Sequence, residues 1–161
     1  MLARPPRGQL REENQKMIWR QLIEFELKNT QRLSPQEVKL RVTFTYNQAL
    51  LCLYHHADVW YDAAMYQMQM GSPDEAAKWL ERAVTALPDS IILCFAYADF
   101  EESRKNTKAA QALYEKLLTR RNDSIIYIQY QKFLRRIDVR YCVTIFYFFN
   151  KKNSHKFVGG K

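Results

Sequence analysis

The sequence predicts an all-α fold in which antiparallel helix hairpins stack into a superhelix, and three observations support this prediction. A helical pattern repeats every 34 residues, and Val42, Ala76 and Ala110 begin three matching stretches. Residue patterns typical of helix N-termini alternate along the chain with short turns. Finally, 47% of the 161 residues are hydrophobic and only four are glycine, which suits helices that each bury one face. A repeat of this length is typical of helical solenoids.

The repeat predicts which residues pack inside each hairpin. On the second helix of each hairpin, four inward positions recur with amphipathic spacing. They are Val42, Tyr46, Ala49 and Leu50, then Ala76, Leu80, Ala83 and Val84, then Ala110, Tyr114, Leu117 and Leu118. The first helices carry large rings six residues apart: Trp19 and Phe25, Trp60 and Tyr66, Phe100 with Cys94 in the first position, and Tyr127 and Phe133. We expect these rings to form the core against the small residues of the second helices.

Seven helices are expected, and the chain divides accordingly. Residues 1–12, which contain Pro5, Pro6 and Gly8, are expected to form a flexible leader. Residues 13–136 are expected to form the repeat domain of about three and a half hairpins, and residues 137–161 an atypical basic and aromatic tail that is not part of the repeat fold. The helices are expected at about 13–29, 35–54, 58–70, 73–87, 90–105, 107–121 and 124–136.

The first four helices have the following justification. The 13–29 helix is predicted from periodicity alone. The 35–54 and 73–87 helices start at Ser34-Pro35-Gln36-Glu37 and Ser72-Pro73-Asp74-Glu75, and both patterns predict a capping box with proline at the first helical position. Asp58 is expected to cap the third helix. Gly71 is expected to end that helix in the left-handed conformation.

The last three helices follow from similar signals. Pro88 prevents the fourth helix from continuing, and Ser90 is expected to cap the fifth. The sixth helix is predicted from its match to the repeat, and Ser124 is expected to cap the seventh. No second helix of a fourth hairpin follows Arg136, so we expect an uncovered apolar face and possible self-association.

The formal net charge of +8 is concentrated in one part of the sequence. Residues 132–161 carry a net charge of +7, because eight Lys and Arg residues face Asp138 alone. The rest of the chain is nearly balanced, so composition does not make the repeat region a nucleic-acid binder. The longest apolar run, 143–149, is too short to cross a membrane as a helix, and the N-terminus lacks the apolar core of a signal peptide.

The chemistry of the sequence gives no reason to expect a catalytic, cofactor, metal or small-molecule site. Cys52, His55 and His56 match no zinc spacing, and the three cysteines imply no disulfide framework. Cys142 has no evident base to activate it. Glu101 and Glu102 point about 100° apart on a helix, so they are poorly placed to share a substrate. The motifs of phosphate-binding loops are also missing from the sequence.

Four arginines are the candidates for RNA contact: Arg120, Arg121, Arg135 and Arg136. Tyr127 and Tyr130 lie between the two pairs and could stack on bases. The alternative, which we favour, is that these tyrosines pack between hairpins while the arginines face solvent.

The tail has a different character from the repeats. Its run Val143–Phe149 is β-prone and uncharged, and would favour aggregation if exposed. Phe, Tyr, Ile, Asn and Lys share A/T-rich codons, so we hypothesise that residues 137–161 are translated non-coding sequence. An uninterrupted exon across codons 130–161 would contradict this hypothesis.

Residues 10–136 resemble a known family of repeat proteins. The second unit nearly satisfies the tetratricopeptide template. However, the motif that recurs is an aromatic residue, then five residues, then a second aromatic residue that is often followed by an acidic one. This motif resembles the HAT (half-a-TPR) repeat. Longer segments, 55–64, 95–104 and 127–136, are similar to the large HAT-repeat subunit of the cleavage stimulation factor, in the suppressor-of-forked family. The matching HAT positions are Trp19, Phe25, Glu26, Tyr46, Ala49, Trp60, Tyr66, Leu80, Ala83, Phe100, Glu101, Tyr114, Tyr127 and Phe133.

This resemblance implies a nuclear scaffold in pre-mRNA 3′-end cleavage and polyadenylation. It implies other cleavage and polyadenylation factor subunits as partners, self-association through the second HAT subdomain, and mainly indirect contact with pre-mRNA. The chain matches the start of that second subdomain, and its tail departs from the family's pattern. Two alternatives remain: a HAT scaffold of the spliceosome or of ribosome biogenesis, and direct RNA binding through the basic C-terminal end.

Overall fold

The computed structural model describes residues 8–137, a range that contains seven α-helices and no β-strand. This confirms the all-α class. The helices are α1 (Gln9–Leu27), α2 (Pro35–Cys52), α3 (Ala57–Gln69), α4 (Pro73–Ala86), α5 (Ile91–Ser103), α6 (Thr107–Arg120) and α7 (Ser124–Ile137).

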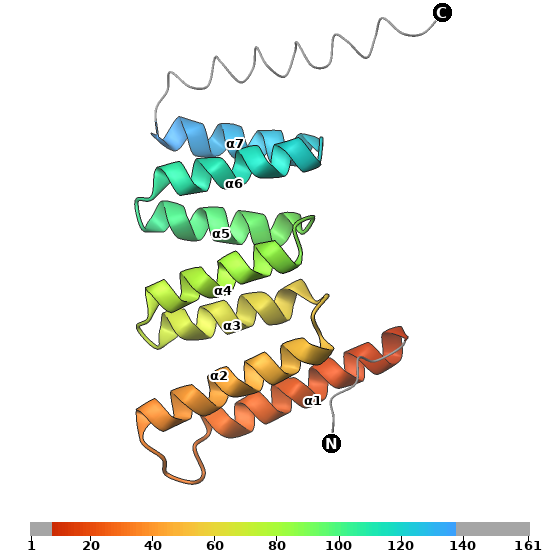
Figure 1. Ribbon diagram of the computed structural model, residues 1–161, viewed down its shortest axis with the longest axis vertical. Helices are drawn as coiled ribbons and strands as arrows, with labels where there is room; N and C mark the ends of the chain where they lie inside the picture. The colour runs from red at the N-terminus through yellow and green to blue at the C-terminus, as the bar shows by residue number, and fades with distance from the viewer. Residues whose placement is uncertain (1–7, 138–161) are drawn as a thin grey trace, which may run out of the picture.

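The helices form an elongated stack of antiparallel hairpins. The pairs α1–α2, α3–α4 and α5–α6 lie one above another, with α7 beyond them (Figure 1). Each helix packs against the next one in the chain, and α3 also contacts α5. The contact between α3 and α5 brings together the first helices of two successive hairpins, as the superhelical arrangement predicts.

One of the two predicted capping boxes is present. At the start of α2, the Glu37 amide donates to Ser34 Oγ at 3.4 Å, and Glu37 Oε2 accepts from the Ser34 amide at 2.9 Å. Ser34 Oγ also donates to Glu37 Oε2 at 2.7 Å, and this bond, together with the one from the Ser34 amide, lowers the pKa of the Glu37 carboxyl. The second box, predicted at the start of α4, is wrong. Ser72 caps no amide, because its backbone is not extended and its hydroxyl accepts a hydrogen bond from Lys39 Nζ.

The other predicted helix ends agree in part. Ser90 accepts from the Leu93 amide at 3.5 Å, and Gly71 follows α3 with a φ of 68°, as expected. Asp58 is not the cap of α3, because α3 begins at Ala57 and the carboxylate of Asp58 contacts cations on α1 instead. Ser124 is the first residue of α7 rather than the residue before it.

The N-terminal helix begins earlier than the hydrophobic pattern suggests. α1 starts at Gln9, four residues before the expected start, and the Gly8 carbonyl accepts from the amides of Arg11 and Glu12. Gly8 has a φ of 99°, a conformation that only glycine adopts readily. Leu10 and Arg11 in this extra turn are exposed, which explains why hydrophobic periodicity did not predict the turn.

The buried core follows the 34-residue register closely. Val42, Ala76 and Ala110, which occupy one repeat position on α2, α4 and α6, have no exposed surface. Among the predicted HAT positions, the buried ones are Tyr46, Ala49, Trp60, Tyr66, Leu80, Ala83, Phe100, Glu101, Tyr114 and Phe133; Trp19, Glu26 and Tyr127 are partly buried.

Phe25 contradicts the expectation that every predicted ring lies in the core. Its side chain is 48% exposed, whereas Ile23 is buried. Two residues turn an α-helix by about 200°, so Phe25 points away from the face that Ile23 turns toward α2. The six-residue spacing of rings therefore places both partners in the core on α3 but not on α1.

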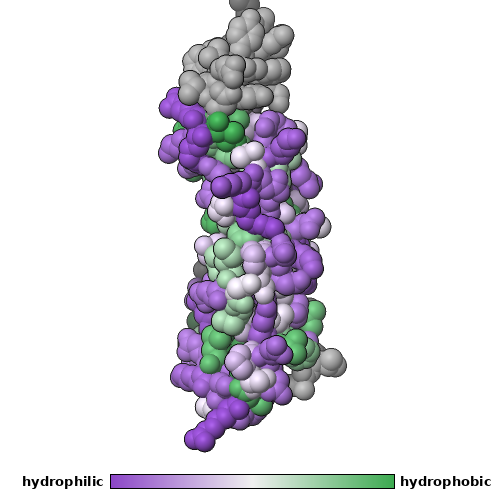
Figure 2. All heavy atoms as spheres, turned by 90° about the vertical axis from the view of Figure 1, so that its left-hand side faces the viewer, coloured by the Kyte–Doolittle hydropathy of each residue, from purple (hydrophilic) through white to green (hydrophobic). Residues whose placement is uncertain are grey.

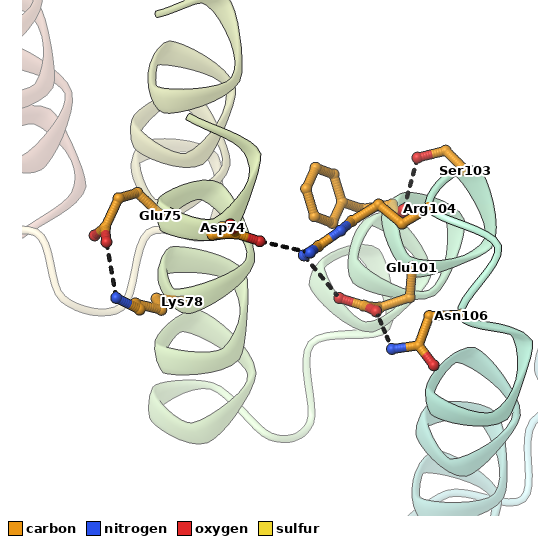
Figure 3. A network of polar contacts seen from close by, with 8 residues as sticks. Asp74, Glu75, Lys78, Glu101, Ser103, Arg104 and Asn106 are labelled. Atoms are coloured by element: carbon orange, nitrogen blue, oxygen red, sulfur yellow. Dashed lines mark hydrogen bonds and ion pairs between the residues drawn. The ribbon is translucent and has the colours of Figure 1, made fainter. Parts of the chain in front are cut away.

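A buried carboxylate on α5 forms a hydrogen bond within the turn between α5 and α6. Glu101 is 4% exposed, and its Oε2 accepts a hydrogen bond from Asn106 Nδ2 at 2.7 Å. Arg104 lies between this carboxylate and α4, with Nη1 3.9 Å from Glu101 and Nη2 2.6 Å from Asp74 (Figure 3). The contacts link the α5–α6 turn to the start of α4 and thus couple two neighbouring hairpins.

Candidate functional site: an apolar groove on the first hairpin

The side of α2 that faces away from the hairpin core is apolar. Leu40, Phe44 and Leu51 are 71%, 64% and 65% exposed, although large apolar side chains usually become buried. The three residues lie on one side of the helix, opposite Val42 and Ala49, which pack inward. We call Leu40, Phe44 and Leu51 the α2 apolar face.

The same positions carry different residues in the other two hairpins. On α4 the equivalents are Asp74, Lys78 and Thr85, and on α6 they are Lys108, Ala112 and Thr119; all six are exposed. The inward positions of the three helices are alike, whereas the outward positions are apolar only on α2. Packing among the described hairpins therefore does not account for the apolar residues at these positions of α2.

The α2 apolar face forms one wall of a groove. Ile18 and Leu22 of α1 line the opposite wall and are 54% and 40% exposed. The groove has a volume of about 1670 Å³. Amide and hydroxyl groups accompany the apolar residues, namely those of Gln15, Thr43, Asn47 and Gln48. Apolar walls accompanied by a few polar groups resemble the apolar core and polar rim of protein interfaces.

An ion pair between the two helices closes one part of the groove wall. Arg41 Nε lies 2.8 Å from Glu26 Oε2, and Arg41 Nη2 donates to Glu26 Oε1 at 2.9 Å. Arg41 Nη1 also donates to Gln31 Oε1 at 2.5 Å. The two contacts between the guanidinium and the carboxylate link α1 to α2. Because the pair neutralises itself, it leaves the groove without net charge.

A further part of the wall has an unused hydrogen-bond donor. The indole Nε1 of Trp19 is buried and has no hydrogen-bond partner. Cys52 lines the same groove, and a thiol is only a weak acceptor. Burial raises the pKa of the Cys52 thiol. The thiol therefore stays neutral near pH 7 and acts here as a small apolar group.

Polar side chains dominate the long edge of the stack that carries the turns after the odd-numbered helices. Figure 2 shows this edge as mostly hydrophilic, with hydrophobic residues in separate small areas. Such a surface is ordinary for a folded protein.

The four arginines proposed for RNA contact have different environments. Arg121 contacts Asp123 at 2.9 Å and the Asp89 carbonyl at 3.1 Å. Arg136 makes two hydrogen bonds of 2.6 Å to Glu102. Arg120 and Arg135 are exposed. At least two of the four guanidinium groups are therefore held by interactions within the chain.

The two tyrosines between these arginines also differ. Tyr130 is buried, stacks on Tyr114 with ring centroids 5.3 Å apart, and donates to Glu115 Oε1 at 3.0 Å. Its ring is not accessible to a base. Tyr127 is half-buried.

The described residues place no group of three or more His, Cys, Asp or Glu where it could hold a metal ion. Cys52 is buried, whereas His55 is exposed beside Tyr54 and His56 lies 3.7 Å from Glu12. Within residues 8–137, no helix has the length and apolar character required to cross a membrane. Cys142 and the tail hypothesis concern residues outside the described range.

Sequence reasoning did not identify the α2 apolar face. The signal was present in the repeat, because Leu40, Phe44 and Leu51 stand where the later units have charged or small residues. The inward positions of the repeat carry no information about this apolar face. A comparison of the outward positions between repeats would have found the groove.

Comparison with known proteins agrees with this architecture. A model described as the suppressor of forked protein matches residues 1–152, which extends beyond α7 into the range where the sequence pattern is expected to end. Cleavage stimulation factor subunit 77 of Arabidopsis thaliana is 44% identical over 138 residues, which cover 86% of this chain. The mRNA 3′-end-processing protein RNA14 of Cryptococcus neoformans is 30% identical over 84% of the chain, and the suppressor of forked protein of Drosophila melanogaster is 28% identical over 84%.

The aligned part is a small fraction of each relative. The matches span 19%, 13% and 24% of the plant, fungal and insect proteins. The family model nevertheless matches most of this chain, and the helical repeat described above is what the resemblance implies. The chain belongs to the suppressor of forked family.

Proposed function

We propose that the chain is a scaffold segment in nuclear pre-mRNA 3′-end cleavage and polyadenylation. Its relatives are named as processing proteins of that pathway. We further propose that the α1–α2 groove binds an amphipathic helix of another subunit of the same machinery. The observation that carries this proposal is the α2 apolar face, because the equivalent positions of α4 and α6 are polar or small.

The packing of the chain supports a helix as the occupant. Within the stack, α5 already packs against both helices of the α3–α4 hairpin. The groove between α1 and α2 offers a comparable surface, with large apolar residues on both walls. Because its Glu26–Arg41 pair is neutral, the apolar side of a helix fits better than a highly charged segment. The amide of Gln48 can hydrogen-bond with polar residues at the edge of such a helix.

The test is an RNase-treated pull-down from nuclear extract, followed by mass spectrometry. The bait is the whole 161-residue chain or a variant with Leu40→Asp, Phe44→Lys and Leu51→Thr. These substitutions copy the residues that α4 carries at the same positions, so α2 should remain folded, which circular dichroism would check. We expect the original chain to retain cleavage and polyadenylation subunits and the variant to lose them.

A matched control places the same new residues at other exposed apolar positions. Ile92→Thr, Ile125→Asp and Ile128→Lys change side chains that are 72%, 52% and 51% exposed. This control should retain the same subunits as the original chain. Equal retention by the α2 variant would contradict the groove as the binding site. Recovery of spliceosomal or ribosome-assembly proteins in place of cleavage subunits would favour the alternative scaffold function.

A further inference from the structure

The near-neutral charge of the repeat region conceals two parts of opposite sign. Residues 8–103 carry nine Lys and Arg residues and fourteen Asp and Glu residues, a net charge of −5. Residues 104–137, which comprise α6, α7 and the turn before α6, carry nine basic and two acidic residues, a net charge of +7. The α6–α7 end of the stack is therefore strongly basic even without the tail.

Three of these cations form a row along the outer side of α6. Lys108, Lys116 and Arg120 are exposed, whereas Ala110, Tyr114 and Leu117 are buried on the opposite side. With 100° and 1.5 Å per residue, the three cations lie within about 120° of the helix circumference, at successive steps of about 12 and 6 Å along the axis. Successive phosphates of an extended nucleic-acid strand follow one another at comparable intervals. We call these three residues the α6 basic row.

No acidic side chain of the described residues forms an ion pair with this row. The acid within α6 is Glu115, whose Oε1 accepts hydrogen bonds from Gln111 at 2.8 Å and from Tyr130 at 3.0 Å. By contrast, Arg121 and Arg136 are engaged with Asp123 and Glu102. The charges of Lys108, Lys116 and Arg120 are therefore available to a ligand, whereas those of the two engaged arginines are not.

Two members of the row also act together electrostatically. Burial raises the pKa of the Cys94 thiol on α5, and both Lys116 and Arg120 oppose that rise. The charges of both residues therefore act on the same group of the neighbouring helix.

The composition of the row favours nucleic acid over an acidic protein. The binding energy of protein interfaces is concentrated in buried aromatic and apolar anchors. The outer side of α6 offers none, because Ala112 and Thr119 are the uncharged residues between the cations. Contacts to a phosphate backbone need only positioned cations.

We propose that Lys108, Lys116 and Arg120 bind the phosphate backbone of single-stranded RNA without selecting its sequence. The row carries no aromatic side chain on which bases could stack, so affinity depends on charge alone. This proposal does not rest on the α1–α2 groove, which lies on another hairpin and has its own test.

The experiment measures fluorescence anisotropy of a labelled uridine RNA of about 20 nucleotides, bound by the whole chain at about 50, 100 and 200 mM KCl. The row variant carries Lys108→Gln, Lys116→Gln and Arg120→Gln. Three lost phosphate contacts should reduce the slope of log affinity against log salt by about 2 and weaken binding at about 100 mM salt by about tenfold or more.

A matched control removes the same charge from the acidic part of the chain. Arg11→Gln, Lys28→Gln and Arg32→Gln affect exposed cations that form no ion pair with a described residue. This control should bind within about twofold of the original chain. Equal affinity of the row variant and the original chain would overturn the proposal and would assign any RNA binding to other cations of the chain. Row-dependent binding of a polyglutamate of similar length, as tight as that of RNA, would overturn it in favour of an acidic polypeptide.

Discussion

Replacement of the buried carboxylate in the α5–α6 turn should destabilise the stack more than replacement of the acid beside it. Glu101 is 4% exposed, and its main partner is Asn106 Nδ2 at 2.7 Å. Arg104 adds a weaker ion pair at 3.9 Å. A charge-assisted hydrogen bond contributes about 1.5–3 kcal/mol, and a partly exposed ion pair adds up to about 1 kcal/mol. We therefore expect Glu101→Ala to lower the free energy of unfolding by about 2–3 kcal/mol.

The substitution Glu101→Gln separates the two contributions. Glutamine keeps an oxygen that can accept from Asn106 but loses the charge that attracts Arg104, so the expected loss is about 1 kcal/mol. Glu102→Gln is the matched control because Glu102 pairs with Arg136 on the surface at 2.6 Å. Exposed ion pairs contribute about 0–1 kcal/mol, so this control should cost less than Glu101→Ala.

The assay is urea denaturation followed by circular dichroism, with a double-mutant cycle between Glu101 and Asn106. The cycle isolates their interaction from other effects of each change, and a coupling energy of about 1–2 kcal/mol is expected. Coupling near zero, or a larger loss from Glu102→Gln than from Glu101→Ala, would refute the argument that the buried hydrogen bond stabilises the turn.

Three further predictions concern single side chains. Ser34→Ala should lower the free energy of unfolding by about 1 kcal/mol because it removes a helix cap, whereas Ser72→Ala should cost less than half as much because Ser72 caps no amide; urea denaturation of both variants compares them, and equal losses would contradict this. Tyr66→Phe should leave the free energy of unfolding unchanged or raise it by up to about 1 kcal/mol in the same assay, because the Tyr66 hydroxyl is buried without a partner. Burial raises the pKa of Tyr114 to about 12, above its ordinary value near 10, so its ionisation favours the unfolded chain as pH rises from about 10 to 12. Tyr114→Phe should therefore flatten the loss of stability between about pH 10 and pH 12, and an unchanged pH profile would refute this.

The sequence was sufficient to predict the seven helices, because a 3.6-residue hydrophobic period and a 34-residue repeat constrain the same positions. Val42, Ala76 and Ala110 were predicted to lie inside and are fully buried. A capping motif in the sequence does not by itself predict that the capping hydrogen bond forms. Ser34 and Ser72 head near-identical stretches, yet only the backbone at Ser34 is extended enough for its oxygen to meet the amide.

Other features depend on tertiary contacts that a local pattern does not contain. Phe25 has the spacing of a core ring, but the pairing of α1 with α2 turns Ile23 inward instead. Asp58 has the residue type of a cap, but cations from α1 reach its carboxylate. The apolar residues of the candidate groove could be identified in the sequence by comparing the outward positions of the repeats. The shape of the groove could not, because it depends on how α1 and α2 cross. The α6 basic row could be counted from the sequence, but only contacts show which arginines are already engaged.

The 34-residue register separates the inward residues, which stabilise each hairpin, from the outward residues, which form its surface. Inward residues of α2, α4 and α6 are interchangeable in kind, while the residues on their outer sides are apolar, mixed and basic in turn. Substitution on an outer side should change what can attach there while the stability of the stack changes little. A chain with this architecture can gain or lose binding sites one hairpin at a time. The order of the repeats along the axis then sets the order in which bound molecules are arranged.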